Sequence, residues 1–197
     1  MIALRPFLAS LVSFASLTIT HRSAAIELET YVAKGNPRTF GVDFSIGRPK
    51  AWVDRKTGDT RQLAVFWKTP TGLVDSMTLI VPPTQTRDGK VTKEDFKEMF
   101  ANPQLEKMLG RSLTSATFLR KVNLEDFKFP AGFLEYVTKF KLPTGEREVK
   151  VRNYLIYLGS VQIQVQFYLV QEGGEDRLKE FDAAMNQIVE TLEMTQP

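Results

Sequence analysis

The sequence contains no cysteine, and it has a single histidine, His21, among its 197 residues. Without cysteine the protein forms no disulfide and offers no thiolate nucleophile or cysteine ligand for zinc. With its only histidine near the N-terminus, the rest of the chain lacks the base on which Ser-His-Asp and Cys-His catalysis depend. Stability therefore rests on a hydrophobic core, and a chain of this length in which 43% of residues are hydrophobic can bury one.

Long hydrophobic runs are scarce as well, apart from one short stretch near the N-terminus. Arg5 precedes an uncharged segment over residues 7–20, and Ser23 and Ala25 suit a signal-peptidase site that cuts after residue 25. The segment is shorter than the roughly 20 residues that a membrane-spanning helix needs. We predict a signal peptide over 1–25 and a single exported domain over 26–197, with an uncleaved anchor or a packed N-terminal helix as the alternative.

This export prediction does not identify one compartment. The protein would be periplasmic or secreted in a bacterium, or would lie in the thylakoid lumen of a photosynthetic cell. We expect no transmembrane span in the mature chain.

The sequence has little excess charge of either sign. Its formal net charge is +3, and cleavage would remove Arg5 and Arg22 but no acidic residue, leaving a nearly neutral chain. Nucleic-acid binding requires a concentrated basic surface, so we expect no nucleic-acid partner. The densest basic segment is interrupted by acidic residues and is interpreted as a solvated turn surface, with a nucleic-acid or lipid-headgroup patch as the alternative: Arg48, Lys50, Arg55, Lys56 and Arg61.

Alternating hydrophobic residues predict most of the strands. In the first half they indicate strands over 39–46, 63–67 and 76–81, the last two joined as a hairpin by the turn residues 69–72. In the second half they indicate strands over 118–122, 133–142, 149–158 and 161–170. Short turns at 142–146 and 159–160 predict that the last three strands form an antiparallel meander.

Two further segments show the pattern of helices. Thr92 and Asp95 resemble a capping box at the start of one helix, and Asn102 before Pro103 indicates the start of another that ends near Gly110. Residues 175–194 carry apolar side chains at spacings of three and four, which predicts an amphipathic C-terminal helix packed on the sheet.

This order of elements resembles the PsbP-like superfamily, which includes the photosystem extrinsic proteins and exported bacterial DcrB-type relatives. The resemblance is carried by Gly47–Trp52, by the strand pair around 154–161 and by the closing helix around 188–192. It implies an α+β fold, an α/β/α sandwich whose antiparallel sheet is flanked by helices on both faces. It also implies a mostly non-catalytic accessory or binding role. Because the mature chain would lack histidine, no metal site is carried over.

Catalysis would have to come from the remaining polar residues. Glu135 with Asp75 is a candidate carboxylate pair of the kind that glycosidases use, although chance pairings are expected among 23 acidic residues. Ser112, Ser115 and Ser160 are present, but none lies in a G-x-S-x-G or S-x-x-K motif. We therefore predict no catalytic residue, no metal ligand and no cofactor.

Two surfaces are candidates for binding. The first is a polar row on one face of the last strand, formed by Gln162, Gln164, Gln166 and Tyr168. The second is an aromatic set, Trp52, Phe66 and Trp67, which could stack on a sugar or a peptide. A solvated outer face and ordinary core packing are the respective alternatives.

These observations favour an exported, non-catalytic accessory or binding module of the cell envelope that is monomeric. Two alternatives remain: a carboxylate-dependent hydrolase of envelope polymers, and a peripheral subunit of a membrane complex. The expected partner is an envelope protein or a membrane complex.

Overall fold

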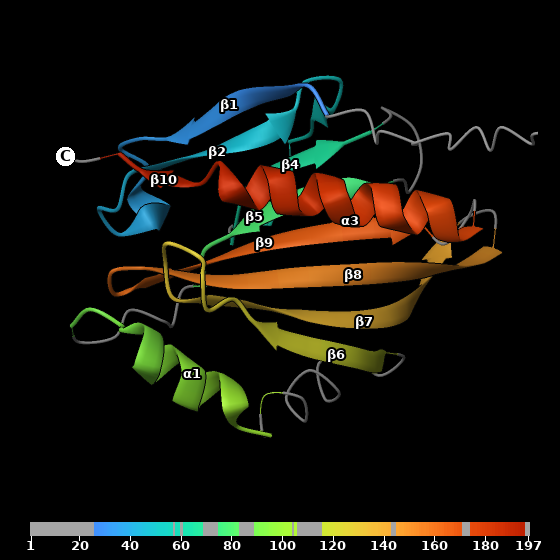
Figure 1. Ribbon diagram of the computed structural model, residues 1–197. Helices are drawn as coiled ribbons and strands as arrows, with labels where there is room; N and C mark the ends of the chain where they lie inside the picture. Colours follow the sequence, from blue (N-terminus) through green and yellow to red (C-terminus); the bar gives the residue numbers. More distant parts are fainter. Residues whose placement is uncertain are drawn as a thin grey trace, which may run out of the picture.

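A computed structural model describes residues 26–56, 58–59, 61–68, 75–82, 89–103, 105, 116–142, 145–170 and 174–195. Its largest element is a seven-stranded antiparallel sheet with the order β3-β4-β5-β9-β8-β7-β6 (Figure 1). The strands are β3 (Val53–Asp54), β4 (Gln62–Trp67), β5 (Ser76–Ile80), β6 (Thr117–Asn123), β7 (Ala131–Leu142), β8 (Gly145–Leu158) and β9 (Val161–Val170). The predicted signal peptide lies outside the described residues.

The predicted hairpin and meander are present in this sheet. β4 pairs with β5, and β7, β8 and β9 pair in sequence order. The pairing of β7 with β8 runs from Leu142 opposite Gly145 to Ala131 opposite Ile156. β9 then returns beside β5, so the early hairpin and the late meander form one continuous sheet.

A second antiparallel sheet of three strands packs on one face of the large sheet. Its order is β1-β2-β10, with β1 (Leu28–Ala33), β2 (Phe44–Pro49) and β10 (Glu193–Met194). The buried side chains of β2, Phe44 and Ile46, join the main core, and Tyr31 on β1 meets Phe66 on β4 edge to face at 5.6 Å between ring centroids. The two sheets thus share one hydrophobic core.

Helix α3 (Gly174–Glu190) covers the same face of the large sheet, beside the small sheet (Figure 1). Its apolar stripe faces inward: Met185 and Ile188 are buried, and Phe181 meets Phe167 of β9 at 6.3 Å between ring centroids. After α3 the chain turns at Leu192, which is fully buried, and enters β10.

Helix α1 (Lys93–Ala101) packs against the other face, over β7 and β8. Its capping box is formed as predicted, because the Thr92 hydroxyl accepts from the Asp95 amide and the Asp95 carboxylate accepts from the Thr92 amide. Phe100 lies against Gly132 of β7, where an added Cβ would be only 2.9 Å from the ring. Glycine at this position therefore allows the close approach of helix and strand.

The expected α/β/α sandwich is wrong. The described part of the chain contains two α-helices, and neither forms a layer by itself: α1 covers one end of its face, and α3 shares the opposite face with the small sheet. The protein is mostly β-sheet. No strand was predicted over 28–33, whereas β1 and β2 form a separate sheet with β10 on the face where a helical layer was expected.

Two element boundaries also differ from the predictions. The strand expected over 39–46 begins only at Phe44, because Asn36 caps a short 3₁₀-helix (Pro37–Thr39) and Phe40 then adopts a left-handed conformation with φ of 52°. The terminal helix expected over 175–194 ends at Glu190, and its last two predicted residues are in β10. The body of the helix expected after Asn102 lies outside the described residues.

Candidate functional site

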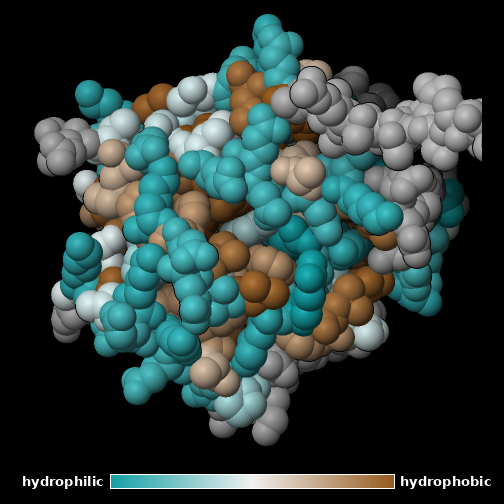
Figure 2. All heavy atoms as spheres, in the orientation of Figure 1, coloured by the Kyte–Doolittle hydropathy of each residue, from teal (hydrophilic) through white to brown (hydrophobic). Residues whose placement is uncertain are grey.

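A groove of about 800 Å³ runs along one flank of α3, between this helix and the segment that follows β2. From α3 it is lined by Arg177, Glu180, Phe181, Ala183, Ala184 and Gln187, and from the rest of the chain by Ile26, Glu27, Pro49, Lys50, Ala51, Trp52, Lys68, Asp75 and Leu169. Figure 2 shows this side of the molecule, where hydrophilic side chains dominate and hydrophobic ones are visible in the recesses between them. The volume suits a small-molecule or side-chain binding site.

The middle of the groove is apolar because of residue size and position. Ala183 and Ala184 present methyl groups on the flank of α3, so the helix leaves room in front of Trp52. Trp52 is 9% exposed and belongs to the main core cluster. The indole therefore forms a fixed wall of the groove.

The backbone opposite α3 is held by hydrogen bonds. The Lys50 amide donates to the Glu27 carbonyl at 2.9 Å and the Trp52 amide to the Pro49 carbonyl at 2.9 Å. The Trp52 carbonyl accepts from Arg48 at 3.1 Å. Gln187 of α3 donates to the Ile26 carbonyl at 3.2 Å and so connects the two walls.

Charged groups lie toward the ends of the groove. At one end the buried Asp75 accepts two hydrogen bonds of 2.7 Å from Arg177 and lies 3.4 Å from Lys68. At the other end Lys50 and Glu27 form an exposed ion pair at 2.6 Å. The contact between Arg177 and Asp75 fixes the start of α3 on the sheet.

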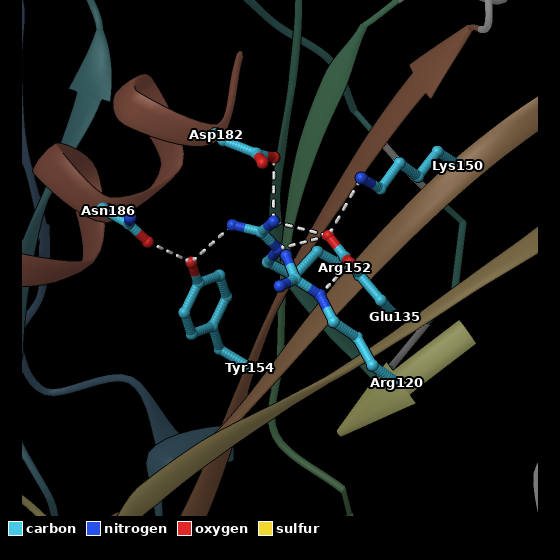
Figure 3. Close-up of polar contacts among 7 residues, drawn as sticks. All are labelled: Arg120, Glu135, Lys150, Arg152, Tyr154, Asp182 and Asn186. Carbon is cyan, nitrogen blue, oxygen red and sulfur yellow. Dashed lines mark hydrogen bonds and ion pairs between the residues drawn. The ribbon is translucent and has the colours of Figure 1, made fainter. Parts of the chain in front are cut away.

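The opposite flank of α3 rests on a second polar cluster, around Glu135 of β7 (Figure 3). The Glu135 carboxylate accepts from Arg120 at 2.6 Å and from Arg152 at 2.8 and 2.5 Å, and Lys150 lies 3.2 Å away. Arg152 also donates to Asp182 of α3 at 2.8 Å. These side chains come from three adjacent strands and one helix.

A second contact of this cluster reaches α3 one turn further along. The Tyr154 hydroxyl donates to the Asn186 side-chain oxygen at 2.8 Å, and it lies 3.4 Å from Arg152. Burial raises the pKa of Tyr154. The phenol therefore remains a hydrogen-bond donor at neutral pH, and α3 is attached to β8 at two successive turns.

A β-bulge in β6 directs Arg120 into this cluster. The pairing register shifts between Phe118 and Arg120, which leaves Leu119 as the extra residue, 48% exposed. Without the extra residue, alternation would place Arg120 on the other face of the sheet. The bulge is therefore what brings a third cation to Glu135.

The Glu135 cluster is suited to holding α3 and not to transferring protons at neutral pH. Burial alone would raise the pKa of Glu135, but hydrogen bonds from Arg120 and Arg152 and the charges of Arg152 and Lys150 lower it to about 2. A carboxyl group with this pKa stays ionised near neutral pH and cannot serve there as a general acid.

The carboxylates of the suggested pair, Asp75 and Glu135, do not converge. Asp75 directly precedes β5 and Glu135 is on β7, with β9 and β8 between them. Three strand spacings correspond to about 14 Å, more than the carboxylate separation of either class of glycosidase. Each carboxylate is paired with arginine instead.

The predicted polar row lies on the face of the large sheet away from α3. Gln164 accepts from Asn153 at 3.4 Å and from Gln166 at 3.2 Å, and Tyr168 donates to Gln166 at 2.6 Å. Burial raises the pKa of Tyr168 to about 12. Gln162 is buried, and its side-chain oxygen has no hydrogen-bond partner among the described residues. Most of the row is thus occupied by internal hydrogen bonds.

The predicted aromatic set is divided between three environments. Trp52 lines the groove, and Phe66 is in the core at 1% exposure. Trp67 is opposite Ser76 on β5, and Ser76 is opposite Tyr168 on β9, so Trp67 lies on the same face of the sheet as the polar row. The Arg55 guanidinium stacks on the Trp67 ring, 3.8 Å from its centroid. Of the two predicted surfaces, only Trp52 is part of the groove.

The basic segment is largely neutralised by neighbouring groups. Arg48 pairs with Glu29 at 2.5 Å, Lys50 with Glu27, and Arg61 with Asp59 at 2.8 Å. Among the described residues no group of three or more histidine, cysteine, aspartate or glutamate side chains is arranged to hold a metal ion. In the same part of the chain, no helix is long and apolar enough to cross a membrane.

The pairing at the centre of the Glu135 cluster has a signal in the sequence. Leu142 pairs with Gly145, within the turn predicted over 142–146, and counting outward from that pair brings Glu135 opposite Arg152. The contact between Arg177 and Asp75 has no comparable signal, because Arg177 of α3 and Asp75, just before β5, are 102 positions apart.

No protein-family model matches the sequence, and neither does any curated protein. Two solved structures of Mog1 proteins share the fold. The Ran-binding protein Mog1p of Saccharomyces cerevisiae superposes with a TM-score of 0.54 at 11% identity, over 86% of this chain and 96% of Mog1p. A mutant of the protein Mog1 gives 0.52 at 12% identity, over 85% and 96%. LpqN of Mycobacterium tuberculosis, described as involved in cell envelope biogenesis, is a weaker match, with a TM-score of 0.43 at 13% identity over 86% of this chain and 92% of LpqN.

Proposed function

We propose that the protein is an exported, non-catalytic binding module of the cell envelope, and that the groove between α3 and Trp52 holds the apolar part of its ligand. The observation that carries this proposal is the groove itself, which has an apolar middle, charged ends and walls fixed by hydrogen bonds. A site whose walls are already ordered loses less conformational entropy when a ligand binds.

Two further observations support a binding role. The two most prominent buried carboxylates, Asp75 and Glu135, are each paired with arginine and separated by two strands, which leaves them unsuited to joint acid–base work. The fold is shared with the Ran-binding protein Mog1p. The resemblance to the PsbP-like superfamily also favours an accessory role, in the periplasm or outside the cell.

The proposal is tested by capture from the envelope of the producing cell with two matched variants. Ala184→Trp fills the groove from the α3 side, whereas Ala101→Trp places the same side chain on exposed surface at the end of α1. We expect tagged wild type and Ala101→Trp to retain the same component, identified by mass spectrometry, and Ala184→Trp to lose it. Equal capture by all three proteins would exclude the groove as the binding site.

Export has its own measurement. Edman sequencing of the protein recovered from cells should begin at Ile26, and the protein should be in the periplasmic or secreted fraction. Recovery with residue 1 intact in the cytosolic fraction would exclude export.

A further inference from the structure

We propose that the groove binds a single aliphatic chain whose anionic head group lies at Lys68; this rests on the proposed function and names the ligand class of the same site. The inference is drawn from the shape of the groove, from the state of its backbone and from the distribution of its charges.

The groove is long because it follows one stripe of α3. Its lining residues on the helix recur at spacings of three and four, from Arg177 through Phe181 and Ala184 to Gln187. At helical rise, ten residues correspond to about 15 Å. Pro49 and Trp52 supply the facing apolar surface. A linear apolar ligand can lie along such a stripe, whereas a round one would fill only part of it.

The backbone along the wall opposite α3 favours a ligand without peptide groups. The amides of Lys50 and Trp52 are bound to the carbonyls of Glu27 and Pro49, and the carbonyls of Ile26 and Trp52 accept from side chains. An extended peptide binds best where a strand edge offers free amides and carbonyls. A hydrocarbon chain needs no such partners and gains from burial alone.

Lys68 has capacity for an additional anion. Its side chain is 55% exposed at the groove, and its contact with Asp75 is 3.4 Å long. Asp75 already accepts two hydrogen bonds of 2.7 Å from Arg177. At the opposite end Lys50 is engaged with Glu27 at 2.6 Å. An incoming carboxylate or phosphate is therefore attracted to the Lys68 end of the groove.

The two tryptophans provide a direct measurement, since they lie on opposite faces of the large sheet. In the Trp67→Phe variant only Trp52 fluoresces, and in Trp52→Phe only Trp67. We would titrate each with dibromostearate, whose bromine atoms quench by contact. We expect saturable quenching in Trp67→Phe and none in Trp52→Phe. Equal quenching in both variants, or none in either, would overturn the proposal.

The head group is tested in the Trp67→Phe background. Lys68→Gln should weaken dibromostearate binding about tenfold, the loss of one charge-assisted contact. Lys97→Gln removes a lysine that is also exposed and ion-paired, but on α1, and should leave binding unchanged. The dibromostearate methyl ester should bind weakly, and Lys68→Gln should not change its affinity. A brominated alkyl phosphate tests whether the site prefers a phosphate or a carboxylate head group. An ester that binds as well as the acid would overturn the head-group assignment.

The failure of this inference differs from the failure of the proposed function. If Ala184→Trp loses its captured component while Trp52 is not quenched, the groove is a binding site for another ligand class, such as an apolar peptide. If neither result is obtained, the groove binds nothing and both proposals are wrong.

Discussion

Arg152 on β8 lies directly opposite Glu135 on β7, and its guanidinium joins that carboxylate to Asp182 on α3. One buried side chain thus connects two strands and a helix. Both Arg152 and Glu135 are almost completely buried, at 3% and 2% exposure. Removing Glu135 takes away the carboxylate that Arg120, Lys150 and Arg152 share, and Arg152 keeps only its bond to Asp182 among the described ion pairs.

Glu135→Gln should therefore destabilise the protein strongly. Removing one member of a buried ion pair costs about 3–5 kcal/mol. Here the buried Arg152 would keep, among the described residues, only its ion pair with the partly exposed Asp182. The free energy of unfolding from urea denaturation at pH 7 measures this cost. Glu148→Gln, an exposed position on β8, is the matched control and should change stability little. Similar losses in the two variants would show that Arg152 is satisfied without Glu135.

The same carboxylate predicts how stability depends on pH. The pKa of Glu135 is about 2 in the folded protein and is raised to its ordinary value of 4.5 on unfolding. A group whose pKa is lower in the folded state stabilises it above the unfolded pKa, and this contribution is lost as the pH falls from about 4.5 toward 2. Unfolding measured between pH 7 and 2.5 should show a steeper acid loss for wild type than for Glu135→Gln. Parallel curves would contradict the lowered pKa.

Gly47→Ala should weaken the join between β2 and the end of α3. The Gly47 amide donates to the Thr191 hydroxyl at 2.6 Å, and an added Cβ would lie 2.8 Å from that oxygen. We expect a loss of about 1–3 kcal/mol, typical of overpacking. Gly58→Ala is the control, because nothing lies within 4 Å of its Cβ position. Thr191→Ala combined with Gly47→Ala should recover part of the loss, and no recovery would place the strain elsewhere.

The two faces of β9 should respond differently to truncation. Phe167 is fully buried between Tyr154 and Phe181, so Phe167→Ala should cost about 3–5 kcal/mol. Gln164→Ala removes only an acceptor for Asn153 and Gln166, and should cost about 1–2 kcal/mol. Thermal and urea unfolding of both variants give the comparison. Equal costs would mean that the Gln164 face is packed as tightly as the core.

Local pattern was enough to predict the later strands and the start of α1. The alternation along 161–170 and the turn at 159–160 together determine which residues of β9 face the core, and Thr92 and Asp95 form their cap within four residues. These features depend on neighbours in the chain. The alternation over 39–46 predicted a strand that includes Phe40, and this part of the prediction was wrong. Asn36 and Pro37 start a 3₁₀-helix there, and Phe40 is 49% exposed.

The groove and the second sheet could not be predicted in this way. Trp52 was a candidate as an aromatic residue, but its position against Ala184 depends on where α3 lies, and α3 is placed by Arg177, Asp182 and Asn186 through contacts with distant strands. Likewise, nothing near β1 and β2 shows that their third strand is β10. Contacts between residues far apart in the sequence decide both features.

The hydrogen bond from Gly47 to Thr191 spans 144 positions, and β2 lies between one strand that precedes it and another that follows α3. During synthesis, the first hairpin is complete long before β10 leaves the ribosome. Until then one edge of β2 carries unpaired amides and carbonyls, and the core side chains Phe44 and Ile46 have no helix beside them. The small sheet can therefore close only late in translation, after β10 has been synthesised.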